Sequence, residues 1–157
     1  MIGLLTESEI EEVLGLGIIG RIGCHHDGTT YVVPISYAYH KGDVYALTGE
    51  GLKLSIMRQN PEVCFEVETQ KDMANWKSVI SWGTFKELTD PEDRKLGLQI
   101  LTSRILPLES SQTTHLYADW PFPPEELNMI KGIVFQIHLH KKSGRFEKRD
   151  SQINPGL

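Results

Sequence analysis

Apolar and polar residues alternate along much of the chain with the two-residue period that is typical of half-buried β-strands. The clearest case is 133–140, where every residue at an odd position is apolar and the other face carries Val134, Gln136 and two histidines. Several other segments are short, bounded by turn residues and rich in β-branched and aromatic side chains. The predicted strands are 18–24, 30–39, 44–48, 62–68, 78–88 and 133–140.

Other segments follow the helical period instead. The first predicted helix begins after Thr6, which can cap it, and Glu9 three residues later can complete a capping box. A second helix is predicted over 51–60, with Leu52 and Ile56 on one face and a proline directly after it.

A third helix is predicted after Asp90, a good N-cap residue that is followed by a proline suited to the first turn. The stretch 107–124 is polar, rich in proline and long for a loop of a compact domain. Because Tyr117, Trp120 and Phe122 are costly to leave in water, we expect this loop to cover a binding cleft or to contact a partner. The apolar face of the third helix consists of Leu96, Leu98, Ile100, Leu101 and Ile105.

The connections between the strands predict the fold class. Turn residues at 25–28 and 41–43 join successive strands as hairpins, which makes the sheet antiparallel. Closure of such a sheet hides its edges. We therefore predict a mainly β protein with inserted helices, a six-stranded antiparallel barrel that is closed or partly closed. It forms a single domain over 1–150, and 151–157 is a C-terminal tail.

Composition narrows the class of protein. The chain has 157 residues, with 16 Lys and Arg against 21 Asp and Glu, for a formal net charge of −5. This acidic balance argues against bulk binding to nucleic acid or to a membrane surface. No apolar run approaches the roughly 18 residues of a membrane helix, and the first residues lack the pattern of a signal peptide. With only Cys24 and Cys64, we expect a cytoplasmic protein without a disulfide framework.

Gly15, Gly17 and Gly20 have the spacing of a dinucleotide-binding loop, G-x-G-x-x-G. That loop requires a strand before it and a helix after it, so that the helix N-terminus faces the pyrophosphate. The predicted order is the reverse here, with a helix before the glycines and a strand after them. We interpret these glycines as the end of one element and the start of the next.

The histidines and cysteines do not predict a metal site. The run 24–27 (Cys-His-His-Asp) lies in one turn, where neighbouring side chains point apart, and no second cluster completes a tetrahedral site. His138 and His140 share one strand face, but two imidazoles alone are weak evidence. No catalytic residue is assigned, because no serine lies in a nucleophile elbow and no cysteines form a C-x-x-C pair. An enzyme built on this chain would rely on a bound cofactor for its chemistry.

Residues 44–53 combine a strand, a glycine-containing turn and the start of a helix. Free N–H groups and a positive dipole at a helix N-terminus favour anions, and Lys53 adds a full positive charge. The segment is a candidate phosphate-binding site. Solvated lysines at helix starts are common, so this feature alone does not decide the function.

Five segments in order resemble the pyridoxamine 5′-phosphate oxidase-like FMN-binding split barrels, and in particular their nitroimidazole-reductase-like branch. The resemblance covers roughly residues 5–140. Each segment is loose by itself, but the five together, in this order and spacing, are fairly specific. The matching segments are 20–23 (GRIG), 31–37 (YVVPISY), 51–53 (GLK), 58–67 (RQNPEVCFEV) and 76–83 (WKSVISWG).

The resemblance implies a six-stranded split barrel that pairs as a homodimer, with FMN in each of two clefts between the subunits. By this analogy one set of residues lies along the flavin ring, one set lies near the phosphate with Lys53 as its main cation, and one set lies on the next strand of the cleft. The ring set is Pro34, Ile35, Ser36 and Tyr37; the phosphate set is Thr48, Gly51, Leu52 and Lys53; the last set is Ser78 and Val79.

Two departures from the related proteins limit the activity that the resemblance implies. Leu47 stands where the nitroimidazole-reductase-like branch often has a histidine, and 151–157 offers no counterpart to the basic C-terminal substrate segment of the oxidases that act on vitamin B6. We therefore expect an FMN-dependent oxidoreductase that takes electrons from a reduced nicotinamide and acts on some other small organic molecule. Two alternatives remain open. One is a non-catalytic flavin or haem binder for storage, sensing or transfer, with His138 or His140 as an axial ligand; the other is a structural dimer with a vestigial cleft.

Overall fold

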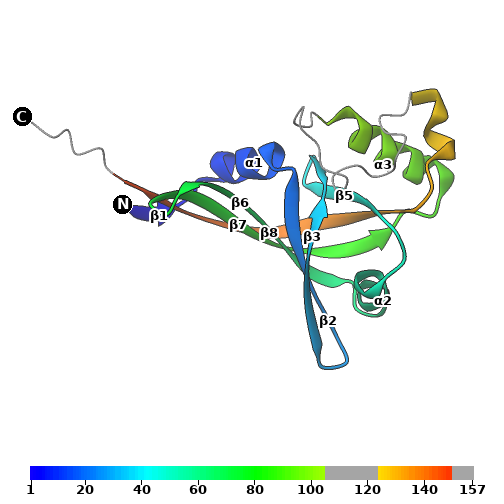
Figure 1. Cartoon of the computed structure of the whole chain (residues 1–157), viewed down its shortest axis with the longest axis horizontal. Helices are drawn as coiled ribbons and strands as arrows, with labels where there is room; N and C mark the ends of the chain where they lie inside the picture. The colour runs from blue at the N-terminus through cyan, green and yellow to red at the C-terminus, as the bar shows by residue number, and fades with distance from the viewer. Residues whose placement is uncertain (105–123, 150–157) are drawn as a thin grey trace, which may run out of the picture.

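The computed structural model describes residues 1–104 and 124–149. It is built mainly from antiparallel strands, as the sequence predicts (Figure 1). The predicted tail 151–157, the loop residues 107–123 and Ile105 lie outside the described residues. The strands are β1 (Ile2–Leu4), β2 (Ile19–His26), β3 (Thr29–Ser36), β4 (Ala38–His40), β5 (Asp43–Thr48), β6 (Glu62–Asp72), β7 (Asn75–Glu87) and β8 (Ile133–Lys148). The helices are α1 (Glu7–Leu16), α2 (Leu52–Gln59), α3 (Pro91–Ser103) and the 3₁₀ helix η1 (Pro124–Met129).

The described residues contain eight strands rather than six. The segment predicted as one strand over 30–39 divides into β3 and β4 at Tyr37. There the tyrosine side chain turns into the core, and its hydroxyl donates a hydrogen bond to the carbonyl oxygen of Leu14 at 2.7 Å. The other additional strand, β1, pairs with the end of β8 through three residues. Both differences arise from contacts between distant parts of the chain, and the antiparallel fold is confirmed.

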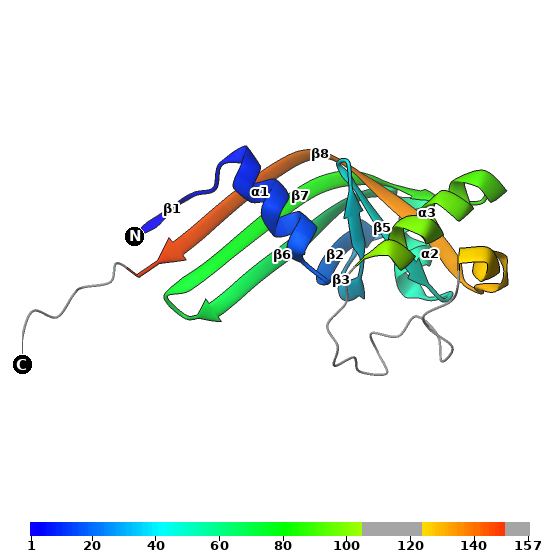
Figure 2. The ribbon, with the colours of Figure 1, turned by 90° about the horizontal axis from the view of Figure 1, so that it is seen from above.

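Three strands extend well beyond their predicted ends. The β6–β7 hairpin continues to Asp72 and Asn75, and β8 continues to Lys148, so that the three strands form a long arm (Figure 1). Helix α1 lies across one face of this arm (Figure 2). Ile10 and Leu5 approach the backbone of β8 at Gly144. Residues 68–72 of β6 are all exposed, so this end of the arm lacks the regular alternation of apolar and polar residues on which the prediction relied.

The sheet curls into a barrel with one unpaired seam. Its strand order is β3-β2-β6-β7-β8-β5-β4, and β4 follows directly from β3 in the chain. However, β4 pairs with β5 only over Ala38–His40. Beyond that point β3 and β5 lie in contact, and no ladder joins them among the described residues. We call this seam between β3 and β5 the split.

Two apolar clusters lie on opposite sides of the sheet. The larger cluster fills the barrel and includes Phe65, Phe135 and Ile137, none of which is exposed. The smaller cluster lies between β5 and β8 on one side and α3 and η1 on the other, and it includes Leu47 and Val134. Val134 belongs to the face of β8 that the alternation assigned to polar residues. It is buried because α3 covers that end of the strand.

The predicted starting points of the helices are confirmed, but two residues predicted on their buried faces are exposed. Thr6 and Glu9 form the capping box of α1, and the side chain of Asp90 caps α3. In α2 the prediction that Leu52 shares the buried face with Ile56 is wrong, because Leu52 is 53% exposed. In α3, Leu96 is 51% exposed and also departs from the predicted apolar face.

The order of elements confirms that the three spaced glycines do not form a dinucleotide loop, since Gly15 lies at the end of α1, Gly17 is its C-cap and Gly20 lies in β2. Two of them allow close packing. A Cβ atom at Gly17 would lie 2.2 Å from the hydroxyl of Tyr37, and one at Gly20 would lie 2.2 Å from the ring of Phe65. Gly15 has nothing within 4 Å of that position.

Gly83 lies where the register of the β7–β8 ladder shifts. We expect its substitution to cause a large loss of stability. A Cβ atom there would lie 2.5 Å from the carbonyl oxygen of His138, which is backbone and cannot move aside cheaply. We expect Gly83→Ala to lower the free energy of unfolding by about 1–3 kcal/mol, as measured by urea denaturation. Gly15→Ala is the matched control and should leave stability unchanged or raise it. Equal stability of Gly83→Ala and the unsubstituted protein would contradict this packing.

Candidate functional site

The split brings two sets of predicted residues to facing sides. Pro34 and Ser36 lie on β3, whose edge toward the split has no strand partner among the described residues. Thr48 is the last residue of β5, and the chain turns from there into α2, which carries Lys53 in its first turn. Free backbone groups therefore lie along one side of the split, and a helix N-terminus lies near the end of the other side.

The N-terminus of α2 has the properties of an anion site. Gly51 is the N-cap residue, and no side chain caps the helix. Lys53 is partly buried and forms no ion pair with any residue that the structure describes. Burial lowers the pKa of the Lys53 ammonium, and the neighbouring Cys24 opposes this shift. A bound anion would stabilise the charged form of this lysine and accept hydrogen bonds from the free N–H groups.

The ring set on β3 divides between the surface and the core. Pro34 is exposed and Ser36 is partly buried, whereas Ile35 is 8% exposed and Tyr37 is 1% exposed. The side chains of Ile35 and Tyr37 therefore support the strand from inside the barrel. The backbone of Tyr37 is engaged as well, because its N–H donates to the carbonyl oxygen of Ile18 at 3.0 Å and its carbonyl oxygen accepts from Arg104.

Ser78 and Val79 are not brought together with the other eight residues in one chain. They lie on β7, which β2 and β6 separate from the β3 side of the split and β8 separates from the β5 side. Val79 is fully buried in the barrel core, while the Ser78 hydroxyl donates to Glu66 at 3.2 Å on the outer face of the sheet. One chain therefore does not bring Ser78 and Val79 to the split.

The outer face of the sheet exposes apolar side chains. Val32 is 62% exposed, Ile80 is 43% exposed and Trp82 is 38% exposed. Val32 lies on β3 and the other two residues lie on β7, with β2 and β6 between them. The register places the three side chains on the same side of the sheet, because Gly23, opposite Val32, pairs with Cys64, which lies opposite Trp82. We call this surface the outer face. A cavity of about 390 Å³ opens on it between Val32, Cys64 and Trp82.

Charged residues that the sequence analysis did not single out hold the elements around the split. The guanidinium of Arg58 binds the carboxylates of Glu50 and Glu87 with four hydrogen bonds of 2.8–3.0 Å. Nη1 of Arg104 donates to the Ser36 hydroxyl at 2.8 Å and to the Tyr37 carbonyl oxygen at 2.9 Å. Burial lowers the pKa of Arg104 to about 10. These partners lie far apart in the chain, so no local pattern indicates them.

The histidines occupy separate surroundings. His138 Nδ1 lies 2.7 Å from a carboxylate oxygen of Asp43, whereas His140 borders the cavity on the outer face. No group of three or more histidine, cysteine, aspartate or glutamate side chains that could hold a metal ion occurs within residues 1–104 and 124–149. Among the described helices, none has the length and apolar character needed to span a membrane.

The chain forms an antiparallel barrel with one open seam, and a partly buried lysine lies at a helix N-terminus beside that seam. These features define a split-barrel protein with a candidate anion site. A family model described as pyridoxamine 5′-phosphate oxidase matches residues 6–146. The chain belongs to this family, which confirms the resemblance inferred from the five sequence segments.

Individual relatives agree with the family and the fold. A curated protein of Rhizobium meliloti, described as uncharacterized, is 32% identical over 85 residues, which is 54% of this chain, and the chain spans 56% of the length of that relative. An FAD-binding protein of Mesorhizobium loti is similar in structure, with a TM-score of 0.73, 29% identity and coverage of 94% of this chain and 99% of its own. A candidate 5-nitroimidazole antibiotic resistance protein of Bacteroides thetaiotaomicron has a TM-score of 0.66 at 17% identity and coverage of 93% and 87%, and it shares the fold.

Proposed function

We propose that this protein binds FMN in the split and uses it to reduce a small organic substrate with electrons from a reduced nicotinamide. The observation that carries the proposal is the state of Lys53, a partly buried cation beside an uncapped helix N-terminus. The pKa of Lys53 is lowered because the effect of burial is larger than the opposing effect of the neighbouring Cys24. The dianionic phosphate of a flavin mononucleotide supplies the missing charge.

The residues around the split fit the other parts of FMN. The phosphate would lie against Lys53 and the N–H groups of the first turn of α2, with the Thr48 hydroxyl near it. The ring would lie along β3 beside Pro34 and Ser36, at the strand edge that has no strand partner among the described residues. A flat ring that carries polar atoms on its rim suits such an edge, while Ile35 and Tyr37 hold the strand in place from within.

A bound flavin supplies the redox chemistry, because it accepts a hydride and passes electrons on. The protein contributes binding, orientation and a partly dry environment. Leu47, which stands where related reductases often have a histidine, is 5% exposed and packs in the cluster beneath α3. It supplies no proton donor to the cleft, so we propose a substrate other than a nitroimidazole.

We also propose that two copies of the chain pair through the outer face. Val32, Ile80 and Trp82 are apolar and exposed there, which is costly for a lone subunit. Pairing would bury them and would bring Ser78 of each copy toward the split of the other. The family relationship supports a homodimer of this kind, with one flavin in each of two clefts.

Absorbance spectroscopy tests the proposed activity. We expect the purified protein to be yellow, or to take up added FMN in preference to FAD, and its flavin band to bleach when NADH or NADPH is added without oxygen. The mass of the released chromophore identifies the flavin. A colourless protein that fails to take up FMN would overturn the proposal, and tighter binding of FAD would overturn the choice of FMN.

One observation favours haem binding as a second candidate function. Asp43 holds Nδ1 of His138, which leaves Nε2 free in the arrangement that is usual for a metal-ligating histidine. This alternative predicts a Soret band on titration with haem that disappears in a His138→Ala/His140→Ala double variant. An unchanged spectrum in the double variant would remove this candidate.

The lowered pKa of Lys53 predicts how FMN affinity depends on pH. The phosphate binds best to the charged form of Lys53. At a pH above the lowered pKa of Lys53, the protein must therefore take up a proton when FMN binds. We therefore expect the dissociation constant to be flat near pH 7 and to rise at alkaline pH, before the ordinary lysine range is reached. Lys53→Arg stays charged at these pH values and should abolish the rise. Parallel curves for both proteins, measured by flavin fluorescence between pH 7 and 10.5, would contradict this role.

A further inference from the structure

A cluster of three charged side chains closes around the loop that leads into α2. Arg58, in the last turn of α2, donates from Nε and Nη2 to the two carboxylate oxygens of Glu87 at 2.8 and 3.0 Å. Nη1 and Nη2 of the same guanidinium donate to the two carboxylate oxygens of Glu50 at 2.9 and 3.0 Å. Both carboxylates are therefore held in the fixed bidentate geometry that only arginine provides. We call this cluster the Arg58 clamp.

The position of Glu50 gives the clamp its significance. Glu50 directly precedes Gly51, the N-cap residue of α2, and its side chain is 68% exposed. A free carboxylate at that place would be attracted by the positive end of the helix. It would compete there with any phosphate, or repel it. In the structure both oxygens of Glu50 are bound to Arg58, and no side chain caps the helix.

We propose that Arg58 is a positioning residue that keeps the anion site of α2 open by holding the Glu50 carboxylate away from it. Glu87, at the end of β7, fixes the guanidinium from the opposite side. Arg58 also neutralises part of the negative charge beside the site. The proposal rests on the proposed function, since it assumes that the FMN phosphate binds at the N-terminus of α2.

A double-mutant cycle on the full-length protein tests this role by FMN titration. Arg58→Ala should weaken FMN binding roughly five- to tenfold, as expected for loss of a network of partly exposed charges. Glu50→Gln alone should change the affinity little. The combined variant Arg58→Ala/Glu50→Gln should recover an affinity within about twofold of the unsubstituted protein, because the competing carboxylate is gone.

The dependence of FMN affinity on salt concentration distinguishes this role from a purely structural one. Raising the KCl concentration from 0.05 to 0.5 M screens the freed carboxylate, so the gap between Arg58→Ala and the unsubstituted protein should narrow. Melting temperatures of all variants report folding separately. Glu87→Gln leaves Arg58 in place but loosens it, and it should weaken binding in the same direction by a smaller factor, which keeps the test valid if Arg58→Ala does not fold.

The possible outcomes separate the two proposals. If the unsubstituted protein takes up no FMN, the proposed function fails and the role of Arg58 fails with it. If the unsubstituted protein binds FMN but folded Arg58→Ala binds it equally well, only the role of Arg58 is overturned. That role is overturned as well if Arg58→Ala/Glu50→Gln is as weak as Arg58→Ala, because Glu50 is then not the competing group.

Discussion

Replacing Lys53 by alanine is expected to weaken FMN binding by about 1–3 kcal/mol, which is roughly 5- to 150-fold in the dissociation constant. The reason is the loss of a charge-assisted hydrogen bond to the phosphate at a position that is partly shielded from water. Because Lys53 forms no ion pair with a described residue, its removal leaves no carboxylate behind without a partner. The melting temperature of the flavin-free protein should therefore stay the same or rise.

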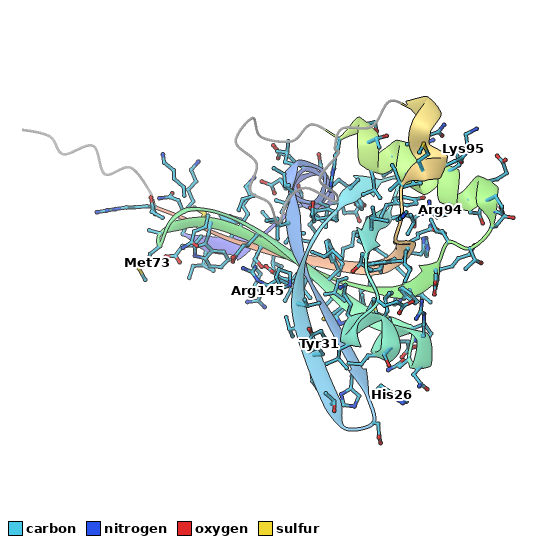
Figure 3. The ribbon with its side chains drawn as sticks, turned by 45° about the vertical axis from the view of Figure 1, so that its right-hand side comes forward. His26, Tyr31, Met73, Arg94, Lys95 and Arg145 are labelled. Carbon is cyan, nitrogen blue, oxygen red and sulfur yellow. The ribbon has the colours of Figure 1, made fainter. Side chains whose placement is uncertain are left out.

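Lys95→Ala is the matched control for this experiment. Lys95 is exposed on α3, on the opposite side of the molecule from the β2–β3 hairpin (Figure 3). Both variants remove one positive charge, so a general effect of net charge would appear in both. Isothermal titration with FMN and with riboflavin, which lacks the phosphate, isolates the contact. We predict that Lys53→Ala changes the affinity for FMN and leaves that for riboflavin unaltered; equal losses for both ligands would contradict a phosphate role.

Placing a lysine at Ile80 is expected to prevent the proposed pairing of two copies through the outer face. Ile80 is 43% exposed near the middle of the outer face and lies directly opposite Glu66 in the β6–β7 ladder. A lysine there can pair with Glu66 within one chain, so the subunit should keep its fold. In a paired dimer the same charge would be buried in an apolar interface, which costs far more than an exposed charge.

Light scattering should show Ile80→Lys as a monomer, and its affinity for FMN should fall by more than tenfold because each cleft loses the wall contributed by the partner. Leu96→Lys is the matched control, since Leu96 is 51% exposed on α3 and does not lie on the outer face. We expect this control to remain dimeric. A dimer of unchanged strength in Ile80→Lys would show that the copies pair elsewhere or do not pair.

Local features of the fold could be predicted from the sequence because they depend on neighbouring residues. The capping box of Thr6 and Glu9 needs only a spacing of three, and the alternation over 133–140 reports burial of one strand face. The kink at Tyr37 could not be predicted, because it depends on a hydrogen bond to Leu14 in a different element. The long arm of β6, β7 and β8 was missed because residues 68–72 of β6 are exposed and show no alternation, so the strand continues there through its pairing with β7.

In the candidate site, too, the features that depend on neighbouring residues could be predicted and those that depend on distant residues could not. Thr48 and Lys53 could be placed together because one turn joins them, and Pro34 could be placed at an edge because proline cannot donate to a ladder. The Arg58 clamp joins residues that are 8 and 29 positions apart, and Arg104 reaches Ser36 across 68 positions. Ser78 and Val79 were assigned to the cleft through resemblance alone. The strand order shows that one chain does not bring them there.

A crystal structure of the protein grown with FMN tests the central claim most directly. We predict two copies that face each other across the outer face, with a flavin in each split. Its phosphate should lie about 3 Å from Nζ of Lys53 and from the first N–H groups of α2, and its ring should run along β3 past Pro34. A phosphate held by other cations, or a flavin bound away from the split, would contradict this claim.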